Sequence, residues 1–305
     1  IIEGWCEMSK ETQESKFDRP RKFGDRKDGW RVRNIDPYMN IVPVLMPGRN
    51  VSCIYFSETI DATNLVDFVK RMNEDEQAKR EKGIRKYTYF GVFMAALVRT
   101  LAMRPHLNRF ISSGKIYQRR NIKLCFVAKK DMTEDAPETD VLAVFKRTAN
   151  LDDVMRKLQG GIREAKEGDD DTTDVLNALF KLPTFMLRGF KGLMDLLLKF
   201  DLFPKSLEKV DPMQSSAFVS NLGSINLVNV PFHHLYERGT CSLFVVMGKI
   251  YPEGDRYKMN FTVTLDERVS NGFYYIRSIE FFKELLSNPE VLLESPSEEE
   301  IPLDI

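Results

Sequence analysis

The stretch Phe261–Tyr275, FTVTLDERVSNGFYY, carries most of the information about the fold. The alternation of polar and apolar residues up to Leu265 predicts a half-buried strand. A polar loop from Asp266 to Gly272 follows, and the aromatic residues after it begin a helix. A strand that ends in charged residues, then a glycine and a helix, can hold reactive side chains rigidly beside a cleft. We therefore expect functional groups in this loop.

Strands and helices alternate on both sides of this stretch, which predicts a mixed α/β chain in one globular unit. The expected helices are one that carries Leu65 to Met72 and is capped by Asp61, and others at 89–103, 151–165, 182–203 and 274–286. The expected strands cover 51–57, 116–118, 122–128, 141–145, 217–220, 242–247 and 257–265. The short gap between 116–118 and 122–128 predicts that these two strands form a hairpin.

Composition and charge exclude several classes of function. Among 305 residues, Lys plus Arg and Asp plus Glu balance at 45 each, so no overall field would recruit nucleic acid. The run Arg19-Pro20-Arg21-Lys22 fits a solvated tail better than a polyanion site. The four cysteines are isolated, which predicts free thiols in a reducing cytoplasm and no zinc or other metal site. The longest apolar run, Tyr87–Val98, is too short to span a membrane.

The segment 182–203 has two interpretations. Its charged residues Arg188, Lys191, Asp195 and Lys199 share one helical face, and the remaining face is apolar. The plainer interpretation is a helix that packs on the core or at a subunit interface. The sharper one is a membrane-surface helix or a lid over a hydrophobic acyl pocket, although three cations and one anion are a weak lipid signal.

Three segments of the chain resemble the catalytic domain of the dihydrolipoyl acyltransferases of 2-oxoacid dehydrogenase complexes. Pro105-His106-Leu107-Asn108 is similar to the family's Pro-x-Leu-Asn segment, and Ser220-Asn221-Leu222-Gly223 to its Ser-Asn-Leu-Gly strand. Asp266-Glu267-Arg268 up to Asn271-Gly272 is similar to its Asp-His-Arg-x-x-Asp/Asn-Gly motif. The order and the intervals agree over roughly residues 31–293.

The resemblance implies a chloramphenicol acetyltransferase-like two-layer α/β sandwich, with a large mixed sheet and covering helices. The acyltransferase-like domain would occupy residues 30–293, between a mobile charged N-terminal arm (1–29) and an acidic tail (294–305). The family moves an acyl group between coenzyme A and a thiol, and it assembles as trimers with the active site between subunits. A homotrimer that uses coenzyme A as acyl-CoA co-substrate is therefore expected.

The resemblance also assigns roles to residues of the motif. A histidine of the family removes the thiol proton, and a serine hydroxyl stabilises the tetrahedral oxyanion. Ser220 falls at the position of that serine. Asn271 falls where the family has Asp or Asn, a residue that braces the loop.

The departure from the family is Glu267, which replaces the histidine. A glutamate ordinarily has a pKa of about 4.3 and a thiol of about 8.5, a mismatch of about 5–6 kcal/mol for proton transfer. Burial of a glutamate raises its pKa and recovers part of this cost. Two functions therefore stay open: acyl transfer by a variant mechanism to a thiol or small-molecule acceptor, or an inactive trimeric binding or assembly scaffold. In the purely structural alternative, Glu267 forms an ion pair with Arg268 beside Asp266.

Histidines elsewhere offer a substitute base. His233 and His234 follow Pro231, and one of them could reach the substrate channel. The plainer expectation is that the two neighbours point in opposite directions, one solvated and one packed. His106 is expected to be a helix-end residue. The first thirty residues contain no lipoyl-type domain, so the acceptor is expected to be free coenzyme A or a small molecule, or a lipoyl domain on another chain. A dehydrogenase subunit on another chain also stays open as a partner.

Overall fold

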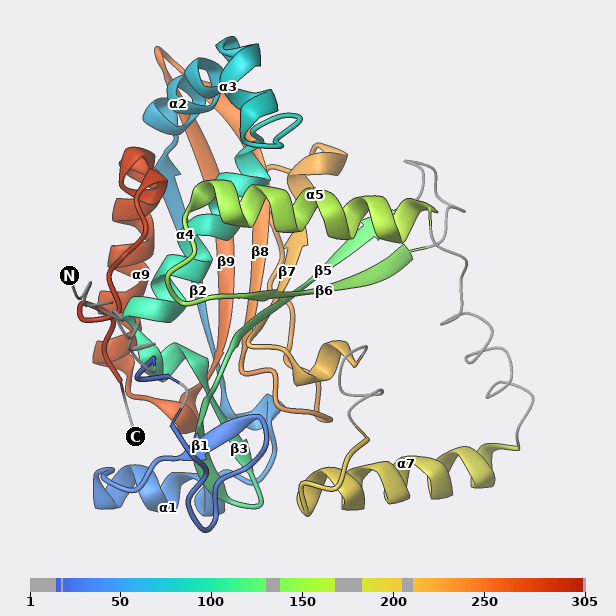
Figure 1. Ribbon diagram of the computed structural model, residues 1–305. Coiled ribbons are helices and arrows are strands. Elements are labelled where there is room, and N and C mark those ends of the chain that lie inside the picture. Colours follow the sequence, from blue (N-terminus) through green and yellow to red (C-terminus); the bar gives the residue numbers. More distant parts are fainter. Residues whose placement is uncertain (1–14, 18, 130–137, 168–182, 205–210, 304–305) are drawn as a thin grey trace, which may run out of the picture.

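The computed structural model describes residues 15–17, 19–129, 138–167, 183–204 and 211–303. Figure 1 shows a large twisted sheet, a small sheet below it, and helices packed across the large one. The strands are β1 (Gly29–Arg31), β2 (Cys53–Asp61), β3 (Arg109–Ser112), β4 (Lys115–Arg119), β5 (Ile122–Lys129), β6 (Glu138–Phe145), β7 (Ala217–Asn221), β8 (Leu243–Glu253) and β9 (Arg256–Asp266). The α-helices are α1 (Pro37–Leu45), α2 (Thr63–Glu74), α3 (Glu76–Glu81), α4 (Tyr89–Met103), α5 (Leu151–Glu167), α7 (Thr184–Lys199) and α9 (Gly272–Ser287). Short 3₁₀ turns are η1 (Asn50–Ser52), η2 (Pro105–Asn108), η3 (Pro212–Gln214), η4 (Leu222–Ile225), η5 (Glu267–Val269) and η6 (Pro289–Leu293).

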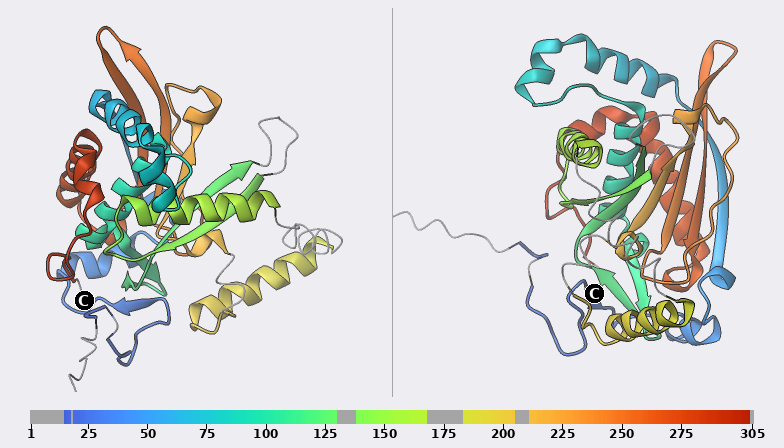
Figure 2. Two further views of the ribbon diagram at one scale, coloured as in Figure 1. Left: turned by 45° about the horizontal axis from the view of Figure 1, so that its top comes forward. Right: turned by 90° about the vertical axis from the view of Figure 1, so that its right-hand side faces the viewer.

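The large sheet is mixed, as predicted. Its six strands lie in the order β2-β9-β8-β7-β5-β6, where β7 is parallel to both β5 and β8 and the other pairs are antiparallel. Figure 2 (right) shows the lime helix α5 on one side of the orange strands β8 and β9. The architecture is thus a sheet with one helical layer.

The predicted hairpin of residues 116–118 and 122–128 is wrong. The first segment is β4, which pairs with β3 and β1 in a separate three-stranded sheet, whereas the second is β5 in the large sheet. The local hairpin is β3–β4, whose turn residues Ser113 and Gly114 both have positive φ, at 52° and 70°. Two positive φ angles are what a tight two-residue hairpin turn requires.

The two faces of the large sheet are buried in different ways. Val245, Phe261, Val263 and other residues of one face form the main core with α2, α4, α5 and α9. On the opposite face a smaller cluster around Phe218 and Phe244 packs against residues of the segment 230–241 instead of a helix. Functional groups on this second face therefore lie under a loop.

The N-terminal segment reaches the small sheet. Residues 1–14 of the predicted mobile arm lie outside the described residues. Farther along, Arg26 is buried and donates to Asp28, to Ser112 and to the carbonyl oxygen of Leu198. This arginine ties the N-terminal segment to β3 and to α7.

Helix α7 forms where the charge spacing predicts it, but it does not pack into the core of its own chain. Met194 is its buried residue. Several large apolar side chains on it are exposed, among them Phe185 at 74% and Leu193 and Leu196 at 51% each. Packing on the core is therefore wrong as an explanation of this apolar face, whereas the interface, membrane-surface and lid interpretations stay predictions.

Candidate active site

The loop that follows β9 is fixed by a buried ion pair. Arg268 donates from Nε and Nη2 to the two carboxylate oxygens of Asp266, each at 2.8 Å, and both side chains are nearly inaccessible to solvent. Arg268 Nη1 also donates to the carbonyl oxygens of Met46 and Pro47, just after α1. This bidentate geometry fixes both the position and the orientation of the loop.

Four further hydrogen bonds hold the same loop: two come from Tyr275 and Arg109 in other elements, one lies within the loop, and one joins it to α9. The hydroxyl of Tyr275 donates to the Asp266 carbonyl oxygen at 2.6 Å, and Arg109 Nη1 donates to that of Val269 at 3.0 Å. Arg268 N donates to the Asp266 side chain, so η5 has a carboxylate cap. Asn271 Oδ1 accepts from Tyr274 N and caps α9. Asn271 therefore braces the end of the loop, as the motif implied.

Glu267 is the acidic side chain of this loop that remains available. It is half-buried at the start of η5, and in the described part of the chain its carboxylate has neither a hydrogen bond nor an ion pair. The structural ion pair proposed for Glu267 and Arg268 is wrong, because Arg268 is paired with Asp266 instead. A rigid loop thus presents one uncommitted carboxylate.

His106 also contacts the loop. His106 lies within η2, and its Nδ1 is 2.9 Å from the hydroxyl of Ser270. Its ring stacks on Tyr274, with 4.0 Å between centroids and 13° between planes. His106 and Ser270 are 164 positions apart, so their spacing in the sequence does not predict this contact. The one sequence feature that points to it is that His106 and the loop both lie in family-like motifs.

Ser220 lies near the end of β7, on the sheet face that lacks helices. It is half-buried and pairs with Val246 of β8, which pairs in turn with Thr262 of β9. Within the described residues its hydroxyl makes no hydrogen bond. The hydroxyl is therefore available as a donor to a ligand.

The structure does not bring Ser220 and Glu267 together within one chain. Strands β7 and β9 run in opposite directions, and the row of Ser220 crosses β9 at Thr262, five residues before Glu267. At about 3.3 Å per residue this places the two residues roughly 16 Å apart along the strands and roughly 10 Å apart across them. Within one chain the two residues therefore lie far apart.

His233 lies on the same face of the sheet as Ser220. Its ring stacks on Phe244 with 3.9 Å between centroids, and Phe244 stacks on Phe218, two residues before Ser220. His233 Nδ1 is 2.6 Å from the carbonyl oxygen of His234, so it is the donor of this contact and Nε2 is the ring's acceptor. Burial lowers the pKa of His233, which favours the neutral imidazole.

The expectation that the adjacent histidines point in opposite directions is wrong, whereas the expectation of one packed and one solvated side chain is confirmed by His233 and His234 respectively. The rings of His233 and His234 stack with 4.8 Å between centroids and 14° between planes. Residues 231–236 do not form a strand, so the alternation of side chains that an extended segment imposes does not apply. His234 is exposed on the outer side of this stack.

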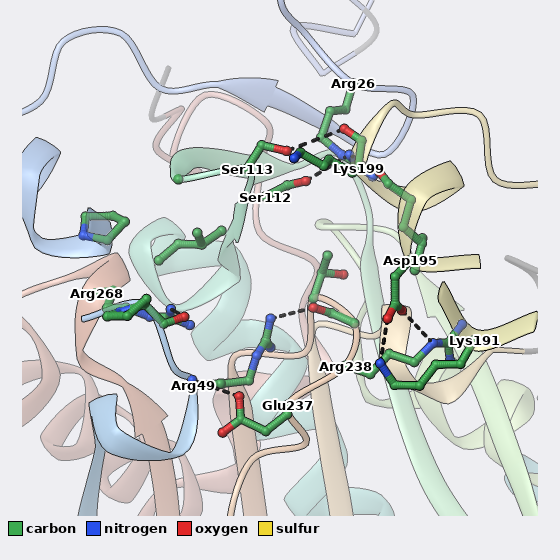
Figure 3. A pocket seen from close by; sticks show the side chains of 17 residues that line it. Arg26, Arg49, Ser112, Ser113, Lys191, Asp195, Lys199, Glu237, Arg238 and Arg268 are labelled. Atoms are coloured by element: carbon green, nitrogen blue, oxygen red, sulfur yellow. Dashed lines mark hydrogen bonds and ion pairs between the residues drawn. The ribbon is translucent and has the colours of Figure 1, made fainter. Parts of the chain in front are cut away.

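A cleft of 570 Å³ lies beside the back of the loop, between α1, the β3–β4 turn and α7 (Figure 3). Its charged lining is mainly cationic and consists of Arg26, Arg49, Lys191, Lys199, Arg238 and Arg268, against Asp195 and Glu237. Burial lowers the pKa of Arg49, and the nearby Asp266 carboxylate opposes this effect. Arg26, Lys191 and Arg268 are paired with Asp28, Asp195 and Asp266, so a part of this positive charge is already neutralised and the remainder faces the cleft.

Two further observations concern the described residues alone. They contain no group of three or more histidine, cysteine or acidic side chains arranged to hold a metal ion. They also contain no helix with the length and apolar content that a membrane span requires.

Comparisons with known proteins agree with the fold. Residues 45–136 match the family model described as 2-oxoacid dehydrogenases acyltransferase (catalytic domain). This match includes the Pro-x-Leu-Asn segment and ends before Ser220 and Glu267. A sequence search of curated proteins found no match.

Among solved structures, the chain is similar to the cubic core of the pyruvate dehydrogenase multienzyme complex, with a TM-score of 0.55 and 14% identity over 87% of this chain and 95% of the other. It is also similar to chloramphenicol acetyltransferase, with a TM-score of 0.52 and 12% identity over 86% and 96% of the two chains. The chain has the chloramphenicol acetyltransferase-like fold. The dihydrolipoamide acetyltransferase of Azotobacter vinelandii, studied for the catalytic roles of one serine, one histidine and one asparagine, has a TM-score of 0.53 and 13% identity over 87% and 95%.

Proposed function

We propose that this protein is an acyltransferase of the 2-oxoacid dehydrogenase type, which moves an acyl group between coenzyme A and a thiol or small-molecule acceptor. The observation that carries the proposal is a rigidly braced loop that presents the unbonded Glu267, on a fold shared with acyltransferases. The separation of Glu267 from Ser220 leads to the second part of the proposal. The active site forms between two copies, with Glu267 of one protomer facing Ser220 of the next in a homotrimer.

The spacing of the motif supports these roles. In the Azotobacter vinelandii enzyme the histidine and asparagine under study are four positions apart. Glu267 and Asn271 are also four positions apart, and here Asn271 caps α9. Glu267 would therefore occupy the position of the base, while Ser220 would donate to the oxyanion.

The reaction follows from the groups available. Glu267 takes the proton of the acceptor thiol, and the thiolate attacks the carbonyl carbon of the acyl-CoA thioester. The Ser220 hydroxyl donates to the oxygen on which negative charge develops. When the tetrahedral intermediate collapses, the bond to the coenzyme A sulfur breaks, and that sulfur takes the proton back from Glu267. Atoms and charge balance without another reactant.

The cationic cleft is the proposed binding surface for the phosphates of coenzyme A. Arg268, the residue after Glu267, lines this cleft, so a ligand bound in the cleft is close to the loop. Figure 3 shows Arg49 and Arg268 toward one side of the cleft and Lys191, Lys199 and Arg238 toward the other. Cations on opposite walls can contact several phosphate groups of one molecule.

Coenzyme A release from acetyl-CoA, with a dithiol and a panel of small acceptors, tests the function. The wild type is expected to release coenzyme A, and Glu267→Gln and Ser220→Ala to lower kcat by about 10²–10³-fold each. Glu284→Gln, a change at an exposed glutamate of α9, is the matched control and should keep full activity. Release at background level, or release that neither active-site variant alters, would contradict the proposal.

An inactive assembly scaffold is the second candidate, and a specific observation favours it. The buried Asp266–Arg268 pair, the Asn271 cap and the exposed apolar face of α7 serve fold and association without any chemistry. Binding of acetyl-CoA without turnover, or co-purification of a dehydrogenase subunit or a lipoyl domain, would support it. Turnover that Glu267→Gln abolishes would eliminate it.

The remaining parts of the proposal concern setting and boundaries. Cys53, Cys125 and Cys241 are free thiols, which supports a cytoplasmic protein. The acyltransferase-like domain is proposed to cover residues 30–293, with the acyl acceptor held on another molecule.

A further inference from the structure

A second cationic site lies away from the proposed active site, around Arg147. This residue follows β6, is only 5% exposed, and donates from Nη2 to the carbonyl oxygens of Arg119 and Arg120. Its Nε and Nη1 atoms are buried, and in the described chain they have no hydrogen-bond partner. Burial lowers the pKa of Arg147 to about 10, and no carboxylate among the described residues opposes this effect. A buried guanidinium without a counter-charge is costly unless an anion joins it.

Arg120, which lines the same cleft as Arg147, also has buried nitrogen atoms that lack a hydrogen-bond partner among the described residues. Its Nε and Nη2 atoms are buried without a partner among the described residues, while Nη1 donates to the Arg19 carbonyl oxygen at 3.4 Å. Nε and Nη2 form the side edge of a guanidinium, which is the fork that binds two oxygens of one carboxylate or phosphate. The free atoms are thus a complete binding edge.

Aromatic rings cover the flat faces of these arginines and leave their edges for hydrogen bonding. The Arg147 guanidinium lies 5.0 Å from the centroid of Phe17. Arg120 and Arg19 lie 4.9 and 5.6 Å from that of Trp30. Because N–H groups point outward in the guanidinium plane, stacking orients their edges without using their donors. The stacking therefore fixes the planes of these guanidinium groups.

Both arginines line one cleft of 340 Å³, which shares no lining residue with the larger cleft beside α7. Lys146 adds a third cation and Thr148 a hydroxyl. Glu298 is the carboxylate of the lining; it is exposed and accepts a hydrogen bond from Ser15. Asp25 and Asp28 also act on Arg120, but they are paired with Arg33 and Arg26. The charged lining therefore keeps an excess of cations: Arg120, Lys146 and Arg147 against Glu298.

We infer that this cleft binds a phosphate group, with Arg120 and Arg147 each donating to its oxygens. A phosphate carries about −1.5 to −2 charges at pH 7 and at least three acceptor oxygens, whereas a monocarboxylate carries one charge and two oxygens. Two guanidinium groups with free donors on both therefore match phosphate better. The site does not depend on acyl transfer, because Glu267 and Ser220 do not line it.

Binding to the full chain tests this inference without any measurement of turnover. Inorganic phosphate and glycerol phosphate are titrated at constant ionic strength against sodium chloride, and the thermal midpoint and ³¹P line widths are recorded. The wild type should show a saturable rise of the midpoint and saturable line broadening. A stronger response to glycerol phosphate assigns a phosphate monoester, and a stronger response to inorganic phosphate assigns the free ion.

Two variants separate binding from folding. Arg120→Gln removes the free fork and Arg147→Lys keeps the charge while removing the planar donors, so each should weaken binding by at least about tenfold. Arg277→Gln, on the exposed surface of α9, should bind like the wild type. Circular dichroism confirms that the variants are folded. Equal responses in all four proteins, or a response that does not saturate, would overturn the inference.

Discussion

Replacing Arg268 by methionine is expected to destabilise the protein severely, because it leaves a fully buried charge. The Asp266 side chain has 0% exposure and receives two hydrogen bonds of 2.8 Å from Arg268. Breaking a buried ion pair by removing one partner costs about 3–5 kcal/mol. Arg49 remains close to Asp266 and supplies some compensation, so we expect a loss near the lower value, about 3 kcal/mol. Total stability is typically about 5–15 kcal/mol, so this loss is large.

Urea unfolding followed by tryptophan fluorescence and circular dichroism measures the change. Arg277→Met is the matched control, since Arg277 pairs with Glu280 on the surface of α9 with 61% and 50% exposure. Such an exposed i,i+3 pair contributes at most about 0.5 kcal/mol. A loss below about 1 kcal/mol for Arg268→Met, or an equal loss in the control, would refute the view that this pair fixes the loop.

Two further predictions follow from packing and titration. A Cβ on Gly223 would lie 2.7 Å from the Gly248 carbonyl oxygen, so Gly223→Ala should lower the free energy of unfolding in urea by about 1–3 kcal/mol. Gly189→Ala in α7, with nothing within 4 Å of its Cβ, should raise it by up to about 1 kcal/mol. A Gly223→Ala variant more stable than the Gly189→Ala variant would contradict the contact. Because burial lowers the pKa of His233 below 6.5, its contribution to stability is complete above pH 6.5 and is lost as pH falls through the folded-state pKa. His233→Gln should therefore reduce the acid-side loss of unfolding free energy, and an NMR titration of the His233 ring with a midpoint at or above 6.5 would contradict this.

Local sequence patterns predicted most of the elements of the fold. Helix α4 begins at Tyr89 and ends at Met103, as the apolar run and the following Pro105 indicated. Asp61 accepts from Thr63 N just before α2, but the N-cap position itself is occupied by Ala62, so the predicted cap is displaced by one residue. These features depend on neighbours in the chain, which a sequence displays directly.

Pairing and proximity over long distances could not be predicted in the same way. The chain leaves the small sheet at Arg119, whose buried guanidinium donates to the carbonyl oxygens of Gln214 and Thr240, about a hundred residues later. This anchor separates β4 from β5, although the gap between them suggested a hairpin. The Ser113-Gly114 turn was the overlooked signal for the real hairpin, β3–β4.

The sequence likewise predicted the residues of the candidate site but not their arrangement in space. The motif gave Glu267, Ser220 and Asn271, and the structure places Asn271 as a helix cap with Glu267 on the same loop. The motif could not show that β7 and β9 run in opposite directions, and this geometry separates Ser220 from Glu267. The contact of His106 with Ser270 also depends on the folded chain.

Complementation between two inactive variants tests the shared active site most directly. Chains with Ser220→Ala and chains with Glu267→Gln are co-expressed in equal amounts, purified together, and assayed for coenzyme A release from acetyl-CoA. If each site takes Glu267 from one protomer and Ser220 from its neighbour, random mixing restores about one quarter of the sites. Each variant alone should stay near background, and the mixture should recover about that fraction of wild-type activity. A mixture no more active than its two components would contradict an active site formed between copies.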